Sequence, residues 1–349
     1  MRPPDRKHTR IGTAAQTGTP WAIILAGGEG KRMRQFTSRW LGVSRPKQYC
    51  TFLGTHSMLE QTVDRARKLV PAERIVTVIG QGHDRYLGKI HLAGRVIQQP
   101  AQKDTGPGIL LPAAYILARD PEATLLIFPS DHFIFPESHF LQYVRRALPL
   151  AASTHKLVLL AAAPDRPEPD YGWIEIGSRL QGRPAGRHER SARRVLRFHE
   201  KPDAAEARDY LARGLLWNTM VMAVKARTLW SQAGQLQPQA EKRLETLLQV
   251  MQMSRRSQSG IRLDAGVPQH IFAGLPSFNF STGFLHPKAQ DCIALPMEGL
   301  LWSDWGRPER VIETIGRMRQ LASLPGGLPG ALELPSGGAL QAQFRSTMA

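Results

Sequence analysis

With 349 residues, 42% of them hydrophobic, the chain is long enough for one large α/β domain or two small ones. Its formal net charge of +17 at pH 7 favours anionic partners, and it has no apolar run near the ~20 residues of a membrane span. Residues 1–20 lack the apolar core of a secretory signal and only two cysteines occur, Cys50 and Cys292, so we expect a cytoplasmic protein without disulfides or a membrane partner.

The first half of the chain alternates short apolar runs with helical patterns. The run at 21–26 ends in glycines and is typical of a buried parallel strand. At 57–70, apolar residues share one helical face, and Ser57 with Glu60 forms a capping box. Strands at 74–80, 123–130 and 156–163 then alternate with helices at 107–118 and 137–151. This order predicts an α/β fold with a doubly wound, mostly parallel sheet.

The pattern changes after residue 163. Short strands at 171–177 and 194–199 and a helix at 203–213 predict a small β-hairpin and helix beside the sheet. We expect one folded domain at 21–324. Residues 1–20 are interpreted as a disordered basic tail. Residues 325–349, rich in glycine, proline and alanine, are interpreted as a flexible tail.

Two basic segments lie between the better patterned regions. Residues 178–194 hold six arginines and one glutamate, and residues 253–262 are also basic and polar. We interpret both as solvated loops, so replacing 183–194 should leave the chemistry intact. No helix-turn-helix, zinc-finger or RNP pattern accompanies them, and no nucleic-acid partner is expected.

The glycine loop LAGGEGKR at 25–32 follows the first strand directly. Glycines let the backbone turn tightly, and successive N–H groups then form an anion nest. Lys31, Arg32 and Lys47 add positive charge suited to a triphosphate. The spacing fits neither a Walker A loop nor a dinucleotide fingerprint. Taken alone, such a loop is more often an ordinary glycine turn.

Six motifs, taken together and in order, resemble the sugar nucleotidylyltransferases, over roughly residues 21 to 320. The motifs are GGEGKR at 27–32, PKQ at 46–48, FPSDHFI at 128–134, YGWIE at 171–175, FHEKP at 198–202 with WN at 217–218, and WSD at 302–304. The PKQ and FPSDHFI versions are similar in particular to the mannose-1-phosphate guanylyltransferases. The resemblance implies a Rossmann-like nucleotidyltransferase fold and a role in GDP-mannose biosynthesis.

The implied reaction transfers a nucleoside monophosphate from GTP to mannose 1-phosphate and releases pyrophosphate. The attacking phosphate is already an anion, because the second pKa of a phosphate monoester is about 6. No catalytic base is required, and the barrier should fall through positioning and charge neutralisation.

The resemblance also assigns roles to residues that match its motifs. The catalytic residues would be Arg32, Lys47, Asp131 and Lys201. The nucleotide would be bound by Ala26, Gly27, Gly28, Gly30, Lys31, Gln99 and Thr105. The sugar phosphate would be bound by Tyr171, Gly172, Glu200, Lys201 and Asn218. A divalent cation, Mg²⁺, would be held by Asp131 and Asp304.

Alternatives remain for several of these residues on physical grounds. Without the resemblance, Asp131 after a strand is as compatible with a helix cap as with a ligand. Glu200 and Lys201 are also compatible with a surface ion pair. His132 is interpreted as structural.

Three positions depart from the family pattern where substrate would be recognised. Gln99 stands where a glutamate is usual, and an amide offers guanine one acceptor and one donor instead of two acceptors. Met220 replaces a glycine, and Ser281 replaces an expected aspartate. We hypothesise a relaxed or shifted sugar preference, while a core position for Met220 remains the alternative.

Three functions therefore remain open. The first is a guanylyltransferase, and the second is the same reaction with another nucleotide or hexose 1-phosphate. The third is a catalytically silent nucleotide-sugar-binding protein. Retention of the phosphate and metal residues favours an enzyme, and a homodimer is a further possibility.

Overall fold

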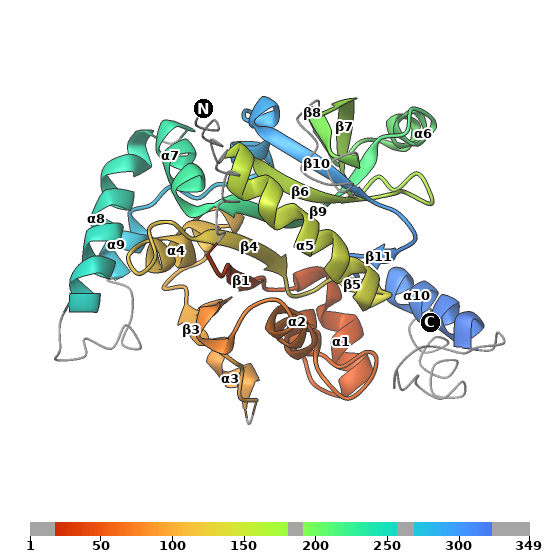
Figure 1. Cartoon of the computed structure of the whole chain (residues 1–349). Helices are drawn as coiled ribbons and strands as arrows, with labels where there is room; N and C mark the ends of the chain where they lie inside the picture. Colours follow the sequence, from red (N-terminus) through yellow and green to blue (C-terminus); the bar gives the residue numbers. More distant parts are fainter. Residues whose placement is uncertain (1–17, 89, 181–190, 237, 257–268, 323–349) are drawn as a thin grey trace, which may run out of the picture.

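The computed structural model describes residues 18–88, 90–180, 191–236, 238–256 and 269–322. A nine-stranded sheet runs through them in the order β3-β2-β1-β4-β9-β6-β10-β8-β7 (Figure 1). The strands of this sheet are β1 (Trp21–Ala26), β2 (Ile75–Ile79), β3 (Arg95–Gln98), β4 (Thr124–Pro129), β6 (Leu157–Ala162), β7 (Gly172–Arg179), β8 (Arg193–Glu200), β9 (Leu216–Lys225) and β10 (Cys292–Met297).

The sheet is parallel through its first half. β3, β2, β1 and β4 are parallel to one another, and β1 pairs Ile23 with Val76 on one side and Ile127 on the other. Because strand side chains alternate between faces, Ile23 packs into one core and Ala22 and Ile24 into another. This explains why the run at 21–26 is apolar throughout.

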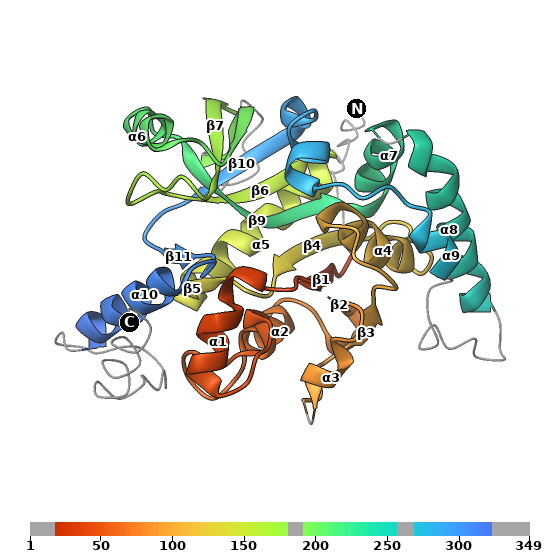
Figure 2. The same cartoon turned by 180° about the vertical axis from the view of Figure 1, so that it is seen from behind.

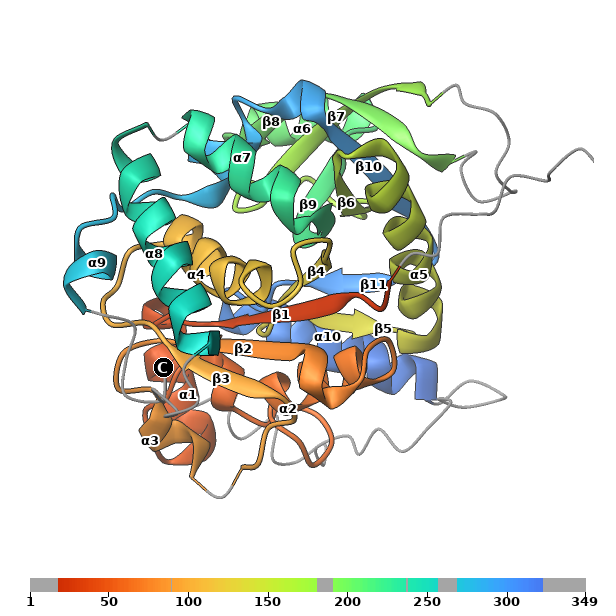
Figure 3. The ribbon, with the colours of Figure 1, turned by 60° about the vertical axis from the view of Figure 1, so that its left-hand side comes forward.

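Helices cover both faces of the sheet. The helices of the described chain are α1 (Arg34–Leu41), α2 (Met58–Arg67), α3 (Asp84–Leu87), α4 (Thr105–Leu117), α5 (Glu137–Thr154), α6 (Ala204–Ala212), α7 (Ala226–Leu236), α8 (Pro238–Arg256), α9 (Gln269–Ala273) and α10 (Pro308–Ala322). α4, α7 and α8 pack together in one layer (Figure 3), while α2 and α5 contribute to the core on the other face. The predicted doubly wound α/β fold is confirmed.

A separate two-stranded ribbon lies beside the main sheet. β5 (Phe133–Phe135) pairs antiparallel with β11 (Leu301–Ser303), and Figure 2 shows this ribbon next to α10. A third core packs Phe133 of the ribbon against Phe36 of α1 and Val311 and Ile315 of α10. The ribbon brings the segments after β4 and β11 together, although they lie far apart in sequence.

β9 is the main element that the sequence analysis did not predict. It lies between β4 and β6 and is antiparallel to both. It also continues to β7, where Trp217 pairs with Trp173. The predicted hairpin at 171–177 and 194–199 is confirmed as β7 and β8, and α6 follows with Asp203 and Glu206 forming its capping box.

The two basic segments differ from the solvated loops expected for them. Residues 178–179 extend β7 and residues 193–194 begin β8, while residues 181–190 lie outside the described chain. Residues 253–256 belong to the last turn of α8, and residues 257–262 are not described. Most of the two predicted tails, residues 1–17 and 323–349, also lie outside the described residues. No helix in the described ranges is long and apolar enough to cross a membrane.

Candidate active site

The glycine loop after β1 is held from behind by two side chains of the PKQ segment. Nε2 of Gln48 donates to the carbonyl oxygens of Ala26 at 3.0 Å and Gly28 at 2.7 Å. The phenol of Tyr49 donates to the Ala26 carbonyl at 3.3 Å. Because these bonds use carbonyl oxygens, they do not occupy the N–H groups of the loop, which an anion nest needs.

A second brace holds the loop at Glu29. Nε2 of His83 lies 3.2 Å from Oε1 of Glu29, and Nδ1 of the same ring lies 3.2 Å from the Tyr49 phenol. Gln102 donates to the same Glu29 oxygen at 3.1 Å. Burial would raise the pKa of Glu29, but the hydrogen bond and charge of His83 outweigh it and hold this pKa below its ordinary value.

A pocket of about 360 Å³ opens in front of the glycine loop. It is lined by Glu29, Gly30, Lys31, Arg32, Met33, Lys47, Asp131, His132, Asp304 and Gly306. The pocket therefore brings together the predicted phosphate cations and both predicted metal carboxylates. Gly30 has φ of +60°, and a Cβ there would lie 3.3 Å from the backbone N of Lys47, so glycine is needed for this close approach.

Lys47 links the two carboxylate residues of the pocket. Its side chain is only 9% exposed, and Nζ lies 3.2 Å from Oδ2 of Asp131 while donating to the backbone carbonyl of Asp304. Ser130, directly after β4, donates from Oγ to the carbonyl of Leu25 at 2.7 Å and so ties the ends of β4 and β1 together. Asp131 therefore lies at the carboxyl edge of the parallel strands, where α/β sheets place ligand sites.

Arg310 of α10 holds Asp304 from the other side. Its Nη1 lies 2.7 Å from Oδ1 of Asp304, and its Nη2 lies 2.8 Å from both Glu168 and Asp170. The guanidinium carbon lies 4.4 Å from the centre of the Tyr171 ring. The sequence analysis did not identify this arginine, because no motif surrounds it and its partners are distant in the chain.

The two carboxylates suit a magnesium ion that also binds phosphates. Burial would raise the pKa of Asp304, but the charges of Lys47 and Arg310 outweigh it and keep the pKa below its ordinary value. The residues that the structure describes contain no cluster of three or more metal-binding side chains. Mg²⁺ typically takes one or two carboxylates and completes its shell with substrate phosphates and water. Asp131 and Asp304 fit that requirement.

The predicted sugar-phosphate residues gather at the β7–β8 end of the sheet. Gly172 pairs directly with Glu200, and a Cβ on Gly172 would lie 3.0 Å from Oε2 of Glu200 and 3.5 Å from Cβ of Asn218. Burial raises the pKa of Glu200, and the charge of Lys201 only partly opposes it. Lys201 is exposed and adopts a left-handed φ of +47°. This group does not line the 360 Å³ pocket.

Tyr171 connects Asp304 of the pocket with the predicted sugar-phosphate residues. It is 3% exposed, and its phenol accepts from the backbone N–H of Asp304 at 3.4 Å and lies 3.4 Å from Ser303 Oγ. Gly172, the next residue, belongs to the sugar-phosphate group. Tyr171 thus positions Asp304 relative to that group, and its own side chain is buried.

Met220, which departs from the family pattern, lies between Asn218 and Ser281, a second position that departs from it. Its sulfur accepts from Nδ2 of Asn218 at 3.6 Å and from Oγ of Ser281 at 3.4 Å, and its backbone N–H donates to Oδ1 of Asn218 at 3.0 Å. Met220 has φ of +56°, a left-handed conformation that costs an ordinary residue about 1–2 kcal/mol. This geometry explains why glycine suits the position, and it places the methionine side chain against Asn218.

The two predicted base-binding residues are placed differently. Gln99 is 6% exposed, and Cβ atoms added at Gly27 and Gly108 would lie 3.1 Å and 2.7 Å from its Nε2. Its amide is therefore buried beside the glycine loop. Thr105 is exposed, and its Oγ1 accepts from the backbone N–H of Phe280 at 2.8 Å. Thr105 thus fastens the segment that leads to Ser281.

Comparisons with known proteins agree with this geometry. The family model described as nucleotidyl transferase matches residues 21–320. The chain is 30% identical over 291 residues to the xanthan biosynthesis protein XanB of Xanthomonas campestris pv. campestris (strain B100), which covers 81% of this chain and 57% of XanB. It is 29% identical over 296 residues to the mannose-1-phosphate guanylyltransferase of Escherichia coli (strain K12), covering 82% and 58% of the two chains.

A solved structure is similar over most of the chain. The crystal structure of mannose-1-phosphate geranyltransferase from Thermus thermophilus matches with a TM-score of 0.67 and 28% identity, and the match covers 84% of this chain and 79% of that one. By contrast, the chain spans little more than half the length of the curated relatives named above.

Proposed function

Because the chain belongs to the nucleotidyl transferase family, we propose that it transfers a nucleoside monophosphate from a nucleoside triphosphate to a sugar 1-phosphate. The observation that carries the proposal is the contact of Lys47 with both Asp131 and Asp304, in a pocket that also holds the glycine loop, Lys31 and Arg32. Cations and carboxylates in one small pocket suit a triphosphate bound together with a metal ion.

The reaction needs little covalent help from the protein. A phosphate oxygen of the sugar 1-phosphate attacks the α-phosphorus, the bond from that phosphorus to the bridging oxygen breaks, and pyrophosphate leaves in line. Arg32, Lys31 and the N–H groups of the glycine loop bind the triphosphate and neutralise the charge on the departing pyrophosphate. Lys47 is fixed by Asp131 and by the Asp304 carbonyl, so its ammonium is already oriented before substrate binds.

A bound Mg²⁺ would neutralise charge on the α-phosphate and on the leaving group. Asp131 and Asp304 would hold it, since both line the pocket. Arg310 and the backbone N–H of Gly306, at 2.7 Å and 2.8 Å, fix one oxygen of Asp304 and leave its Oδ2 for a ligand. Arg310 is therefore a positioning residue in this proposal.

The acceptor would lie near Gly172, Glu200 and Asn218. Gly172 allows the sugar to approach the backbone, Glu200 accepts from sugar hydroxyls, and the exposed Lys201 binds the 1-phosphate. We propose GTP and mannose 1-phosphate as the substrates, because the motifs and the guanylyltransferase relative agree on them.

A second candidate is the same reaction with another base or hexose. Two residues outside the 360 Å³ pocket favour it: beside the glycine loop Gln99 has an amide instead of a carboxylate, and Met220 engages Asn218. An amide pairs one donor and one acceptor with a base edge, which discriminates less strongly for guanine.

Pyrophosphate release from the purified chain tests the proposal. The assay combines four nucleoside triphosphates with mannose 1-phosphate and glucose 1-phosphate, with Mg²⁺ and with EDTA. We expect Mg²⁺-dependent release that is fastest with GTP and mannose 1-phosphate. Release with a different pair would select the second candidate, and no release from any pair would refute the enzymatic function.

A further inference from the structure

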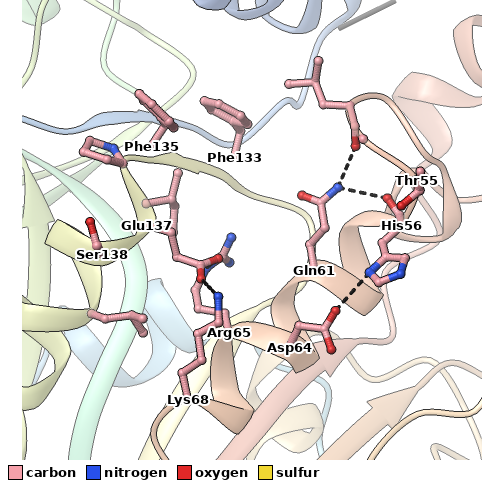
Figure 4. A pocket seen from close by; sticks show the side chains of 15 residues that line it. Thr55, His56, Gln61, Asp64, Arg65, Lys68, Phe133, Phe135, Glu137 and Ser138 are labelled. Atoms are coloured by element: carbon pink, nitrogen blue, oxygen red, sulfur yellow. Dashed lines mark hydrogen bonds and ion pairs between the residues drawn. The ribbon is translucent and has the colours of Figure 1, made fainter. Parts of the chain in front are cut away.

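A second, larger cleft is lined in part by β5 of the β5–β11 ribbon. It has a volume of about 600 Å³, which is within the usual range for small-molecule sites. Its lining shares no residue with the active pocket. The walls come from the segment before α2, from α2 itself, from β5 and from the start of α5 (Figure 4).

Arg65 is the unusual residue of this cleft. Its side chain is only 6% exposed, and its Nε is buried without a hydrogen-bond partner. The nearest carboxylate oxygen, Oε2 of Glu137, lies 3.4 Å from that nitrogen, which is longer than a charge-assisted hydrogen bond of about 2.7–2.9 Å. Buried arginines are normally paired and fully hydrogen-bonded, so this guanidinium, with one long contact to Glu137, has unused donor capacity.

Two further positive features meet at the same place. Lys68 also contacts Glu137, so two cations share one carboxylate. The 18-residue helix α5 begins at Glu137, and no side chain caps its first turn. Its free N–H groups and its helix dipole therefore favour an anion beside Glu137 and Ser138. Figure 4 shows Arg65, Lys68 and Glu137 side by side in the cleft.

We propose that this cleft binds the phosphoryl group of a small molecule. A phosphate oxygen would accept from Arg65 and from the first turn of α5, and Lys68 would turn from Glu137 to the phosphate. A dianion matches two cations and a helix N-terminus better than the single charge of Glu137 does. The hydroxyl of Ser138 and the polar wall at Thr55 and Gln61 would face the rest of the ligand.

Titration calorimetry on the purified chain tests the site, with inorganic phosphate and glucose 6-phosphate as probes and citrate as a carboxylate control. Lys68→Ala should weaken phosphate binding at the cleft about tenfold, because it removes one charge-assisted contact. Arg67→Ala is the matched control. Arg67 ends the same helix, is 60% exposed where Lys68 is 55% exposed, and does not line the cleft. The active pocket also carries cations, but both variants leave it unchanged, so their difference reports on the cleft.

Glu137→Gln supplies a test with the opposite sign. Removing the competing carboxylate should tighten phosphate binding several-fold, whereas Arg65→Met should abolish it. If Arg65→Met fails to fold, the two surface variants still decide the question. Equal affinity in Lys68→Ala, Arg67→Ala and the unchanged protein would overturn the proposal. Weaker binding in Glu137→Gln would do the same, and citrate binding as tight as phosphate would refute the phosphoryl assignment.

Discussion

At the scale of single residues, two aspartates contact one lysine in the candidate active site: Lys47 binds the carboxylate of Asp131 and the backbone carbonyl of Asp304. Asp131→Asn and Asp304→Asn should each lower turnover by about 10²–10³, because one fixed electrostatic contact to the reacting phosphates is worth that much. Initial rates at saturating Mg²⁺ measure turnover, and circular dichroism shows whether each variant keeps its fold. Asp209→Asn is the control, since Asp209 is 58% exposed on α6. Near-normal turnover in either variant would remove that residue from the metal site.

Met220 has a strained backbone conformation and contacts Asn218 and Ser281, through which we expect it to affect the choice of sugar. Met220→Gly relieves the left-handed φ and frees both Asn218 and Ser281 from the sulfur, so the kcat/KM ratio for mannose 1-phosphate over glucose 1-phosphate should change. Met220→Leu keeps the bulk and removes the sulfur contacts, which separates volume from hydrogen bonding. An unchanged ratio in Met220→Gly would show that Met220 is a core residue without influence on the acceptor.

At the scale of secondary-structure elements, Arg310 joins α10 to the segment before β7. Arg310→Met leaves Glu168, Asp170 and Asp304 without their shared cation, and breaking a buried ion pair from one side costs about 3–5 kcal/mol. Urea unfolding measures this loss. Arg317→Met is the control, because Arg317 lies on the same helix but is 38% exposed, and surface ion pairs contribute at most about 1 kcal/mol.

The ion pair between Arg310 and Asp304 also predicts how the stability of the protein depends on pH. The pKa of Asp304 is held below its ordinary value, so the stability from its ionised form is present at neutral pH and is lost as pH falls through the folded-state pKa. The difference in unfolding free energy between Arg310→Met and the unchanged chain should therefore be largest near pH 7 and shrink at lower pH. A difference that stays constant down to the aspartate range would contradict this role for Arg310.

The strands β7 and β8 limit how much of the arginine-rich segment between them can be replaced. Replacing residues 181–190 with a Gly/Ser linker of equal length should leave turnover within a few-fold, because these residues lie outside every matched motif. Extending the replacement to Arg194 should destabilise the chain. Ala192 is fully buried, and Arg193 and Arg194 pair with Ala294 and Ile293 of β10. Rates and melting temperatures of the two variants check this, and a collapse of turnover in the shorter replacement would place the segment at the substrates.

At the scale of the whole molecule, the net charge of +17 should attract the polyanionic triphosphate of the proposed reaction. A positive field raises the local concentration of a triphosphate and is screened by salt, with a Debye length of about 10 Å at 0.1 M. The KM for the triphosphate should therefore rise between 20 mM and 300 mM KCl, while kcat changes less. Sucrose at matched osmolality is the control, and a KM independent of salt would show that the charge plays no part in binding.

Much of the fold and of the site was predictable because the signals are local. Short apolar runs predicted β1, β2, β4 and β6, and helical patterns predicted α2, α4 and α5. The glycine loop, Lys47, Asp131 and Asp304 lie in short motifs, and the structure places them in one pocket. Residues at the carboxyl ends of adjacent parallel strands must meet, so chain order alone brings the glycine loop and Asp131 together.

Tertiary structure decided what depends on contacts between distant segments. β9 enters the sheet as an antiparallel strand, and its ten-residue sequence LWNTMVMAVK carries no local mark of that direction. Arg310 finds Glu168 and Asp170 some 140 residues away, Gln99 is buried beside Gly27 and Gly108, and Arg65 is left facing a cleft. Sequence periodicity reports which face of an element is buried, but the partners of a buried polar side chain are chosen only when the elements pack, because hydrogen bonds and ion pairs require ångström-scale geometry.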